Sequence, residues 1–222
     1  PEDIPACITA GFQTGGKGQS GNHWLSERQK NLLASFVIRP QTLTPASGFY
    51  LSKASALAVY DCLEERLDNI RIKWPNDLLA GHKKIGGILI ENTLAGNQIT
   101  KSIIGIGINI NQETFPSFAP DIEATSLRIE SGRVADPEEI LSEIAENLEF
   151  WIQELDHGNF EGIDREYFTK LMGFQDWKKY NADDRIFEAK IINVKENGYL
   201  VLLTRNEEKL EFAFKEVKLI LA

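Results

Sequence analysis

Cysteine is scarce in this sequence, with two residues among 222. Cys7 and Cys62 lie far apart, and neither has a His or Cys neighbour at the spacing of metal ligands. This pattern excludes a disulfide framework and a zinc site, and it predicts two buried thiols in a reducing compartment. Long apolar runs and a signal sequence are also absent, so we expect a soluble cytoplasmic protein without membrane contact. Because the chain opens on Pro1 and not on Met, we expect an N-terminal piece to be missing.

Positive charge is also in short supply. The 24 Lys and Arg residues are outnumbered by 33 Asp and Glu residues, and the formal net charge is −9. The basic residues are not clustered as phosphate contacts require, so no nucleic-acid partner is expected. The sequence also lacks a Ser-His-Asp set, a cluster of metal ligands and a pair of catalytic carboxylates. An anionic ligand must therefore be held by a local site, and any chemistry must proceed by positioning and electrostatics.

Glycine, by contrast, is concentrated in one loop. The stretch T-G-G-K-G-Q-S-G-N-H-W, from Thr14 to Trp24, holds four glycines within seven residues. Without Cβ atoms such a loop can turn successive N–H groups toward an anion, and Lys17 adds a positive charge. A P-loop would need Ser or Thr where Gly18 stands, and the G-x-G-x-x-G match lacks the helical stripe of a dinucleotide site. The loop therefore predicts a ligand site of another kind, with a mobile surface loop as the alternative.

A second informative stretch is I-R-I-K-W-P-N-D, from Ile70 to Asp77. Its alternation predicts a short strand with Arg71 and Lys73 on one face, ended by Pro75, which has no N–H for the ladder. Lys73 is thus held at a strand end beside an aromatic residue. An ordinary exposed lysine is the commoner case and stays the alternative.

Two later strands carry paired glycines. The stretch K-I-G-G-I-L-I-E begins at Lys84, and I-I-G-I-G-I-N-I-N, from Ile103, places Gly105 and Gly107 on one face. Glycines at alternate positions remove side chains from a strip of sheet. We predict that this strip is the floor of a pocket for a flat or elongated ligand with an anionic group.

The remaining pattern predicts the scaffold. Further strands and helices are expected at 6–13, 31–38, 45–63, 137–158 and 160–171. After Gly173 the chain changes to short alternating strands, with an Asn197-Gly198 hairpin signal. These strands are expected at 186–194, 199–203, 209–214 and 217–221. The sequence thus predicts a domain of residues 1–173 and a small β domain of residues 174–222.

Five blocks, taken in order, resemble the catalytic domain of the biotin protein ligases (biotin–acetyl-CoA-carboxylase ligases). They are QTGGKGQSGNHW, IKWPND, KKIGGILIE, GIGIN and ATSL, and they span Gln13 to Leu127. The resemblance implies an α+β fold with a mixed β-sheet covered by helices, like that of class II aminoacyl-tRNA synthetases and biotin ligases. A small C-terminal SH3-like β-barrel is expected to follow. The absence of a winged helix before the first strand indicates the monofunctional type, without a DNA-binding domain.

The resemblance also implies a two-step reaction. Biotin and Mg-ATP give biotinyl-5′-AMP and pyrophosphate, and the biotinyl group then passes to a lysine of a biotin carboxyl carrier protein. The expected ligands are therefore biotin, ATP and Mg²⁺, with no metal held by the protein's own residues. The oligomeric state stays open, and a homodimer is among the candidates.

Positions that match the family motifs imply the residues of the site. Lys73 matches the family's central lysine and is the expected catalytic residue, because it would neutralise charge between the biotin carboxylate and the α-phosphate. Gln13 is expected at the biotin headgroup, and Trp24 and Asn109 at the adenine. The other expected contacts are Gly16, Lys17, Gly18 and Gln19 in the loop and Gly86 and Gly105 on the sheet.

The sequence departs from the family pattern at the loop. The family usually has G-R-G-R-x-G, whereas Lys17 and Gln19 stand here in place of the arginines. The first change loses bidentate phosphate recognition and the second loses the charge, so we expect weaker retention of the adenylate. The family's Ser/Thr-Thr-Asn biotin contacts lie upstream of the first strand and are not in this sequence. A lipoate or octanoate ligase-type acyltransferase and a non-catalytic biotin- or nucleotide-binding relative are the alternative functions.

Overall fold

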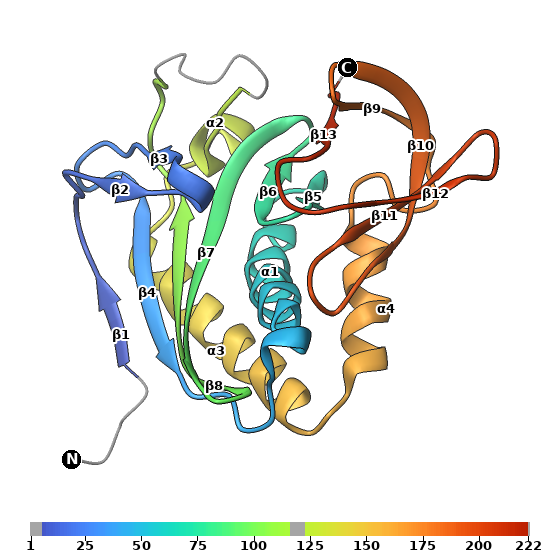
Figure 1. Cartoon of the computed structure of the whole chain (residues 1–222). Helices are drawn as coiled ribbons and strands as arrows, with labels where there is room; N and C mark the ends of the chain where they lie inside the picture. Colours follow the sequence, from blue (N-terminus) through green and yellow to red (C-terminus); the bar gives the residue numbers. More distant parts are fainter. Residues whose placement is uncertain (1–5, 116–122, 222) are drawn as a thin grey trace.

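The computed structural model describes residues 6–115 and 123–221, and the expectation about Pro1 lies outside them. Its centre is a six-stranded sheet in the order β1-β4-β8-β7-β6-β5 (Figure 1). The strands are β1 Ala6–Thr9, β4 Leu32–Ile38, β5 Ile70–Lys73, β6 Asp77–Ala80, β7 Lys83–Ala95 and β8 Gln98–Ile108. These strands pair antiparallel, and single parallel bridges join Ile72 to Leu171 and Lys84 to Ala124. The expected mixed sheet is present, with its parallel part limited to these bridges.

The sequence pattern missed strand β6, which follows Pro75 after a single residue. A tight connection returns the chain from β5 to β6, so that Asp77 lies opposite Lys73. The four residues of β6 are all buried between neighbours on both sides. Four residues are too few for a periodic signal to distinguish a strand from a turn.

Helix α1, Phe49–Glu64, contacts this sheet and is covered by α3, Pro137–Asp156, and α4, Phe160–Lys170 (Figure 1). Thirteen of its sixteen residues are buried, as expected for a helix that is surrounded by other elements. The predicted cap at Thr44 starts a 3-10 turn, and α1 itself begins at Phe49. A short helix, α2, spans Leu127–Ser131. Within the described ranges, none of the helices has the length and apolarity of a membrane span.

A second sheet forms the C-terminal part of the chain, in the order β12-β11-β10-β9-β13. Its strands are β9 Lys178–Ala182, β10 Arg185–Val194, β11 Leu200–Thr204, β12 Lys209–Phe212 and β13 Lys218–Leu219. The Asn197-Gly198 hairpin lies between β10 and β11 as predicted, and Gly198 has φ +91°. The sequence pattern missed β9, because its residues K-K-Y-N-A are mostly polar and show no apolar alternation.

The C-terminal sheet is consistent with the expected SH3-like fold, but the expected closed barrel is not formed by the described strands. β12 pairs with β11 and β13 pairs with β9, and no ladder joins β12 to β13 among the described residues. β12 and β13 are therefore the two edges of this sheet.

The prediction of two buried thiols is right for Cys62 and wrong for Cys7. Cys62 lies inside α1 with its Sγ 3.4 Å from Glu143 Oε2, and burial raises the pKa of its thiol to about 12. Cys7 is exposed, because β1 is an edge strand whose four residues all face solvent.

We expect one thiol per chain to react with a thiol reagent under native conditions at pH 8, and two after unfolding in guanidinium chloride. Cys62 is 1% exposed and stays protonated at this pH, so it offers neither access nor a thiolate. The measurement is a spectrophotometric thiol count, and Cys7→Ser is the control that should abolish the native reaction. Two reactive thiols in the folded protein would contradict the buried position of Cys62.

Candidate functional site

The glycine-rich loop is folded into a small hairpin. Strand β2, Gly16–Lys17, pairs with β3, His23–Trp24, so that Gly16 lies opposite Trp24. A Cβ on Gly16 would collide with the Trp24 carbonyl oxygen and lie 2.9 Å from Gln13 Oε1. Glycine at this position therefore allows the hairpin to close and brings the Gln13 side chain against it.

The Trp24 indole covers the glycines of the main sheet. Gly87 in β7 and Gly107 in β8 lie directly opposite each other in the register. A Cβ on Gly107 would lie 2.6 Å from Trp24 Cε2, and one on Gly87 would lie 3.3 Å from Cζ3. We call Gly87, Gly105 and Gly107 the glycine strip, because alternation puts Gly105 on the face of Gly107. The predicted strip without side chains is therefore present, and an aromatic ring covers one end of it.

The prediction that Gly86 lies on the ligand side of the sheet is wrong, because Gly86 faces the opposite side from the glycine strip. A Cβ on Gly86 would lie 3.6 Å from Leu78 Cβ and 3.5 Å from Ile108 Cδ1, on the opposite side of β7 from Trp24. Its neighbour Gly87 lies beneath Trp24 at the position that was predicted for Gly86. The motif has two adjacent glycines, and the sequence alone does not say which of them faces the loop.

Two lysines meet one buried carboxylate at the end of the glycine strip. Lys84 Nζ lies 2.5 Å from Asp77 Oδ1, and Lys73 Nζ lies 3.5 Å from Asp77 Oδ2. Asp77 is 8% exposed, and the three residues come from β5, β6 and β7. The Lys84 ammonium also lies 5.7 Å from the ring centroid of Trp24, at a distance typical of cation–π contacts. Sequence reasoning singled out Lys73 and treated Lys84 only as part of a turn and a strand.

The A-T-S-L block lies beside Lys84. Thr125 N donates to the Lys84 carbonyl, and Lys84 N donates to the Glu123 carbonyl. Asn109 Nδ2 donates to the Thr125 carbonyl at 2.9 Å, whereas Asn109 Oδ1 is buried without a hydrogen-bond partner. Trp24 Nε1 is also buried without a partner. A ligand that donates to the Asn109 oxygen and accepts from the Trp24 N–H would satisfy both groups.

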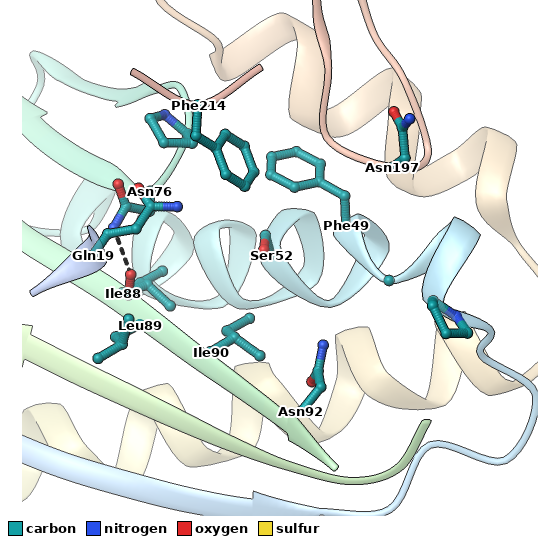
Figure 2. Close-up of a pocket in the computed structure, with 13 residues that line it drawn as sticks. Gln19, Phe49, Ser52, Asn76, Ile88, Leu89, Ile90, Asn92, Asn197 and Phe214 are labelled. Carbon is teal, nitrogen blue, oxygen red and sulfur yellow. Dashed lines mark hydrogen bonds between the residues drawn. The ribbon is translucent and has the colours of Figure 1, made fainter. Parts of the chain in front are cut away.

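A cavity of about 230 Å³ lies next to this site, between the glycine loop and the C-terminal sheet (Figure 2). Gln19 of the loop reaches toward Asn76, whose Nδ2 donates to the Ile88 carbonyl at 2.7 Å. The start of α1 and the C-terminal sheet supply Phe49, Asn197 and Phe214 on the other side. The cavity lining holds no Lys, Arg, Asp or Glu among its described residues.

The structure thus brings together most of the residues that the sequence suggested. Gly16 and Trp24 lie in the hairpin, and the Gln13 side chain lies against it. Gly105 lies in β8, and Asn109 directly follows that strand. Lys17 is exposed on the hairpin, and Gly18 N donates to the Asn22 carbonyl at 2.7 Å within it.

Comparison with known proteins identifies the family. The model of the Biotin/lipoate A/B protein ligase family matches residues 5–109. The chain is 33% identical to the biotin–[acetyl-CoA-carboxylase] ligase of Paracoccus denitrificans over 169 residues. This match covers 71% of this chain and 67% of that relative. The chain belongs to the biotin protein ligase family.

Other members of the biotin protein ligase family match nearly the whole chain. The bifunctional ligase/repressor BirA of Bacillus subtilis is 30% identical over 203 residues, or 89% of this chain, and the chain spans 61% of that relative's length. The solved structure of the biotin protein ligase from Aquifex aeolicus in complex with biotin and ATP has a TM-score of 0.77 at 27% identity. That similarity covers 97% of this chain and 89% of the Aquifex chain, so the C-terminal sheet is included.

Gly107→Ala is expected to lower the free energy of unfolding by about 1–3 kcal/mol, because the added methyl group overpacks the Trp24 ring. Urea denaturation measures this change. Gly15→Ala is the matched control, since a Cβ there would have nothing within 4 Å, and it should stay within about 0.5 kcal/mol of the parent. Equal stability of the two variants would contradict the contact between Trp24 and the glycine strip.

Proposed function

We propose that this chain is an ATP-dependent biotin ligase. In the first step a biotin carboxylate oxygen attacks the α-phosphorus of ATP, which forms biotinyl-5′-AMP and releases pyrophosphate. In the second step the amine of a lysine on a biotin carboxyl carrier protein attacks the biotinyl carbonyl, which forms an amide and releases AMP. The observation that carries this proposal is the meeting of Lys84, Lys73 and Asp77 at the end of the glycine strip, beneath Trp24.

The lysines answer the main electrostatic problem of the first step. A carboxylate and a triphosphate are both anions and repel each other as the reacting atoms approach. A fixed ammonium in a site shielded from water offsets this repulsion by several kcal/mol. We propose that Lys73 and Lys84 supply this charge together, from the two strands that flank β6, with both ammonium groups held by Asp77.

We propose that the remaining site residues bind biotin and enclose the adenylate. We propose that the flat biotin headgroup lies against Gly105, at the end of the glycine strip that the Trp24 ring leaves uncovered. Gln13 is proposed to contact the headgroup. Trp24 and Asn109 offer a buried N–H and a buried carbonyl oxygen to the adenine edge. Gly16, Lys17, Gly18 and Gln19 would then close over the adenylate.

Magnesium is proposed to enter with ATP. Among the described residues no group of three or more His, Cys, Asp and Glu side chains could hold a metal ion. Mg²⁺ commonly keeps several waters and binds through substrate phosphates, so a site built on ATP itself fits this chain. The ion would neutralise phosphate charge, while the protein's contribution stays with Lys73 and Lys84.

Two alternative functions are tested by the same assay. One is a ligase that activates lipoate or octanoate in place of biotin, and the other is a protein that binds biotin or a nucleotide without catalysis. The family model covers both biotin and lipoate ligases, but the named relatives are biotin ligases. Replacing biotin by lipoate or octanoate in the exchange assay tests the first alternative. Binding of biotin or ATP without exchange would favour a non-catalytic relative.

We propose that the reaction takes place in the cytoplasm, where ATP and carrier proteins are both present.

Lys84→Ala is expected to lower biotin-dependent ATP–pyrophosphate exchange by about 100-fold, because the transition state loses one of the two cations held by Asp77. Lys73→Ala should lower it at least as much, since Lys73 is the expected catalytic residue and its side chain is the more buried of the two. The measurement is the rate at which labelled pyrophosphate enters ATP.

Lys83→Ala provides the matched control, because its side chain is 48% exposed and pairs with the exposed Glu123. Its exchange rate should stay within about twofold of the parent, as for other surface substitutions. Full exchange activity of Lys84→Ala would contradict the role assigned to Lys84. Absence of exchange by the parent chain would contradict the proposed function.

Gln19→Arg is expected to slow release of biotinyl-5′-AMP by about tenfold, because it restores a charged hydrogen-bond donor to the loop. Gln19 belongs to the loop that we propose closes over the adenylate, so an arginine at this position extends a guanidinium from the loop toward the phosphate. Release is followed by rapid gel filtration of the labelled complex over time. An unchanged off-rate would show that the loop does not retain the adenylate through this position.

A further inference from the structure

A buried lysine links helix α1 to the C-terminal sheet. Lys53 is 0% exposed, although it lies in a helix whose other buried residues are mostly apolar. Its Nζ lies 2.5 Å from Asp164 Oδ1 on α4 and donates to the Val194 carbonyl at the end of β10, at 3.0 Å. One ammonium on α1 therefore contacts two elements, α4 and β10, that lie more distant along the chain.

The surroundings of Lys53 hold this ammonium in place. Tyr50 donates its hydroxyl to Asp164 Oδ2 at 3.0 Å, and the rings of Tyr50 and Phe168 lie 4.6 and 5.3 Å from the Lys53 Nζ. Burial lowers the pKa of Lys53, and the Asp164 carboxylate opposes that shift. A charge in such a position is costly unless its partners are fixed, so its geometry has little freedom.

Val194 is followed by a turn that reaches the ligand site. We call residues 195–198 the C-terminal turn. Phe49 N donates to the Glu196 carbonyl at 3.0 Å, and Trp74 Nε1 donates to the Gly198 carbonyl at 2.9 Å. Trp74 belongs to the I-K-W-P-N-D block, directly after Lys73. Together with the bond from Lys53 to Val194 directly before it, three hydrogen bonds hold the turn against α1 and the I-K-W-P-N-D block.

The C-terminal turn forms one wall of the cavity beside the site. Asn197 of this turn lines the cavity together with Phe49, Phe214, Gln19 and Asn76 (Figure 2). Asn197 is oriented by accepting a hydrogen bond from Tyr199 N through its Oδ1. The described lining of this cavity is uncharged, which suits an uncharged peptide segment better than a triphosphate.

We propose that Lys53 and Asp164 are positioning residues for the transfer step. Their ion pair sets the position of the C-terminal turn, and thereby the wall against which the acceptor segment of the carrier protein docks. This inference rests on the proposed ligase function. Neither residue touches biotin or ATP in this arrangement, so adenylation does not depend on the pair.

The test compares Lys53→Met with Lys170→Met. Lys170 is a matched control, because it also pairs with a carboxylate, Glu166 at 3.2 Å, and lies 5.1 Å from an aromatic ring, that of Tyr60. It links α4 to α1 through the Tyr60 ring, and within the described part of the chain it does not bond to the C-terminal sheet. Loss of this pair therefore reproduces the loss of a part-buried ion pair without the loss of the bond to Val194.

Two half-reactions are measured for each variant. Lys53→Met should raise the KM for a biotin carboxyl carrier domain by about tenfold or more, because a small displacement of a docking wall is costly. Its ATP–pyrophosphate exchange should stay within about twofold of the parent. Lys170→Met should change neither value. If Lys53→Met does not fold, Asp164→Asn, which keeps an acceptor for Lys53 and Tyr50, takes its place with a smaller rise in KM.

The double variant Lys53→Met/Asp164→Leu separates positioning from general stability. It removes both charges, so its melting temperature should recover relative to Lys53→Met, while the KM for the carrier stays raised because the Val194 carbonyl still lacks its donor. A carrier KM equal to that of Lys170→Met, or a parallel loss of exchange and transfer, would overturn the inference. Absence of exchange in the parent chain would instead overturn the proposed function.

Discussion

The close approach of the Trp24 ring to the backbone of Gly87 and Gly107 is the contact on which the rest of the site depends. It is possible only because the β7–β8 register sets two residues without side chains opposite each other. Through it, a loop that leaves the edge of the sheet is brought down onto its centre. The loop, the glycine strip and the lysines beyond it then form one site instead of three separate features.

A protein with a net charge of −9 needs a local arrangement to bind anions. Asp77 holds two cations close together, because Lys73 and Lys84, from two different strands, lie at its two oxygens. The carboxylate offsets the repulsion between the two ammonium groups, and its burial limits their freedom. Cations that are already fixed need little reorganisation when charge develops, which is the condition under which electrostatic stabilisation is most effective.

The C-terminal sheet is physically continuous with the catalytic part. Gly198 contacts Phe49 and Phe214 so closely that a Cβ there would lie 2.8–2.9 Å from their rings, and its carbonyl accepts from Trp74. The same block of sequence that contains Lys73 thus also anchors the C-terminal turn. The C-terminal part of the chain also supplies Asn197 and Phe214 to the lining of the cavity.

The sequence by itself determined the elements and the chemistry of the blocks. Apolar periodicity located β4, α1 and α3, the Asn-Gly pair located the β10–β11 hairpin, and the ordered motifs pointed to the family. These signals are local, because strand and helix periods and turn preferences depend on neighbours along the chain.

Only the tertiary structure decided which residues face one another. It placed Cys7 on an exposed edge, turned Gly87 and not Gly86 toward Trp24, left the C-terminal sheet open, and brought Lys84 to Asp77 and Lys53 to Asp164. Each of these outcomes depends on edge position, strand register or a partner far away in the sequence. A local pattern carries no record of such partners, because they are set by how the sheets and helices pack together.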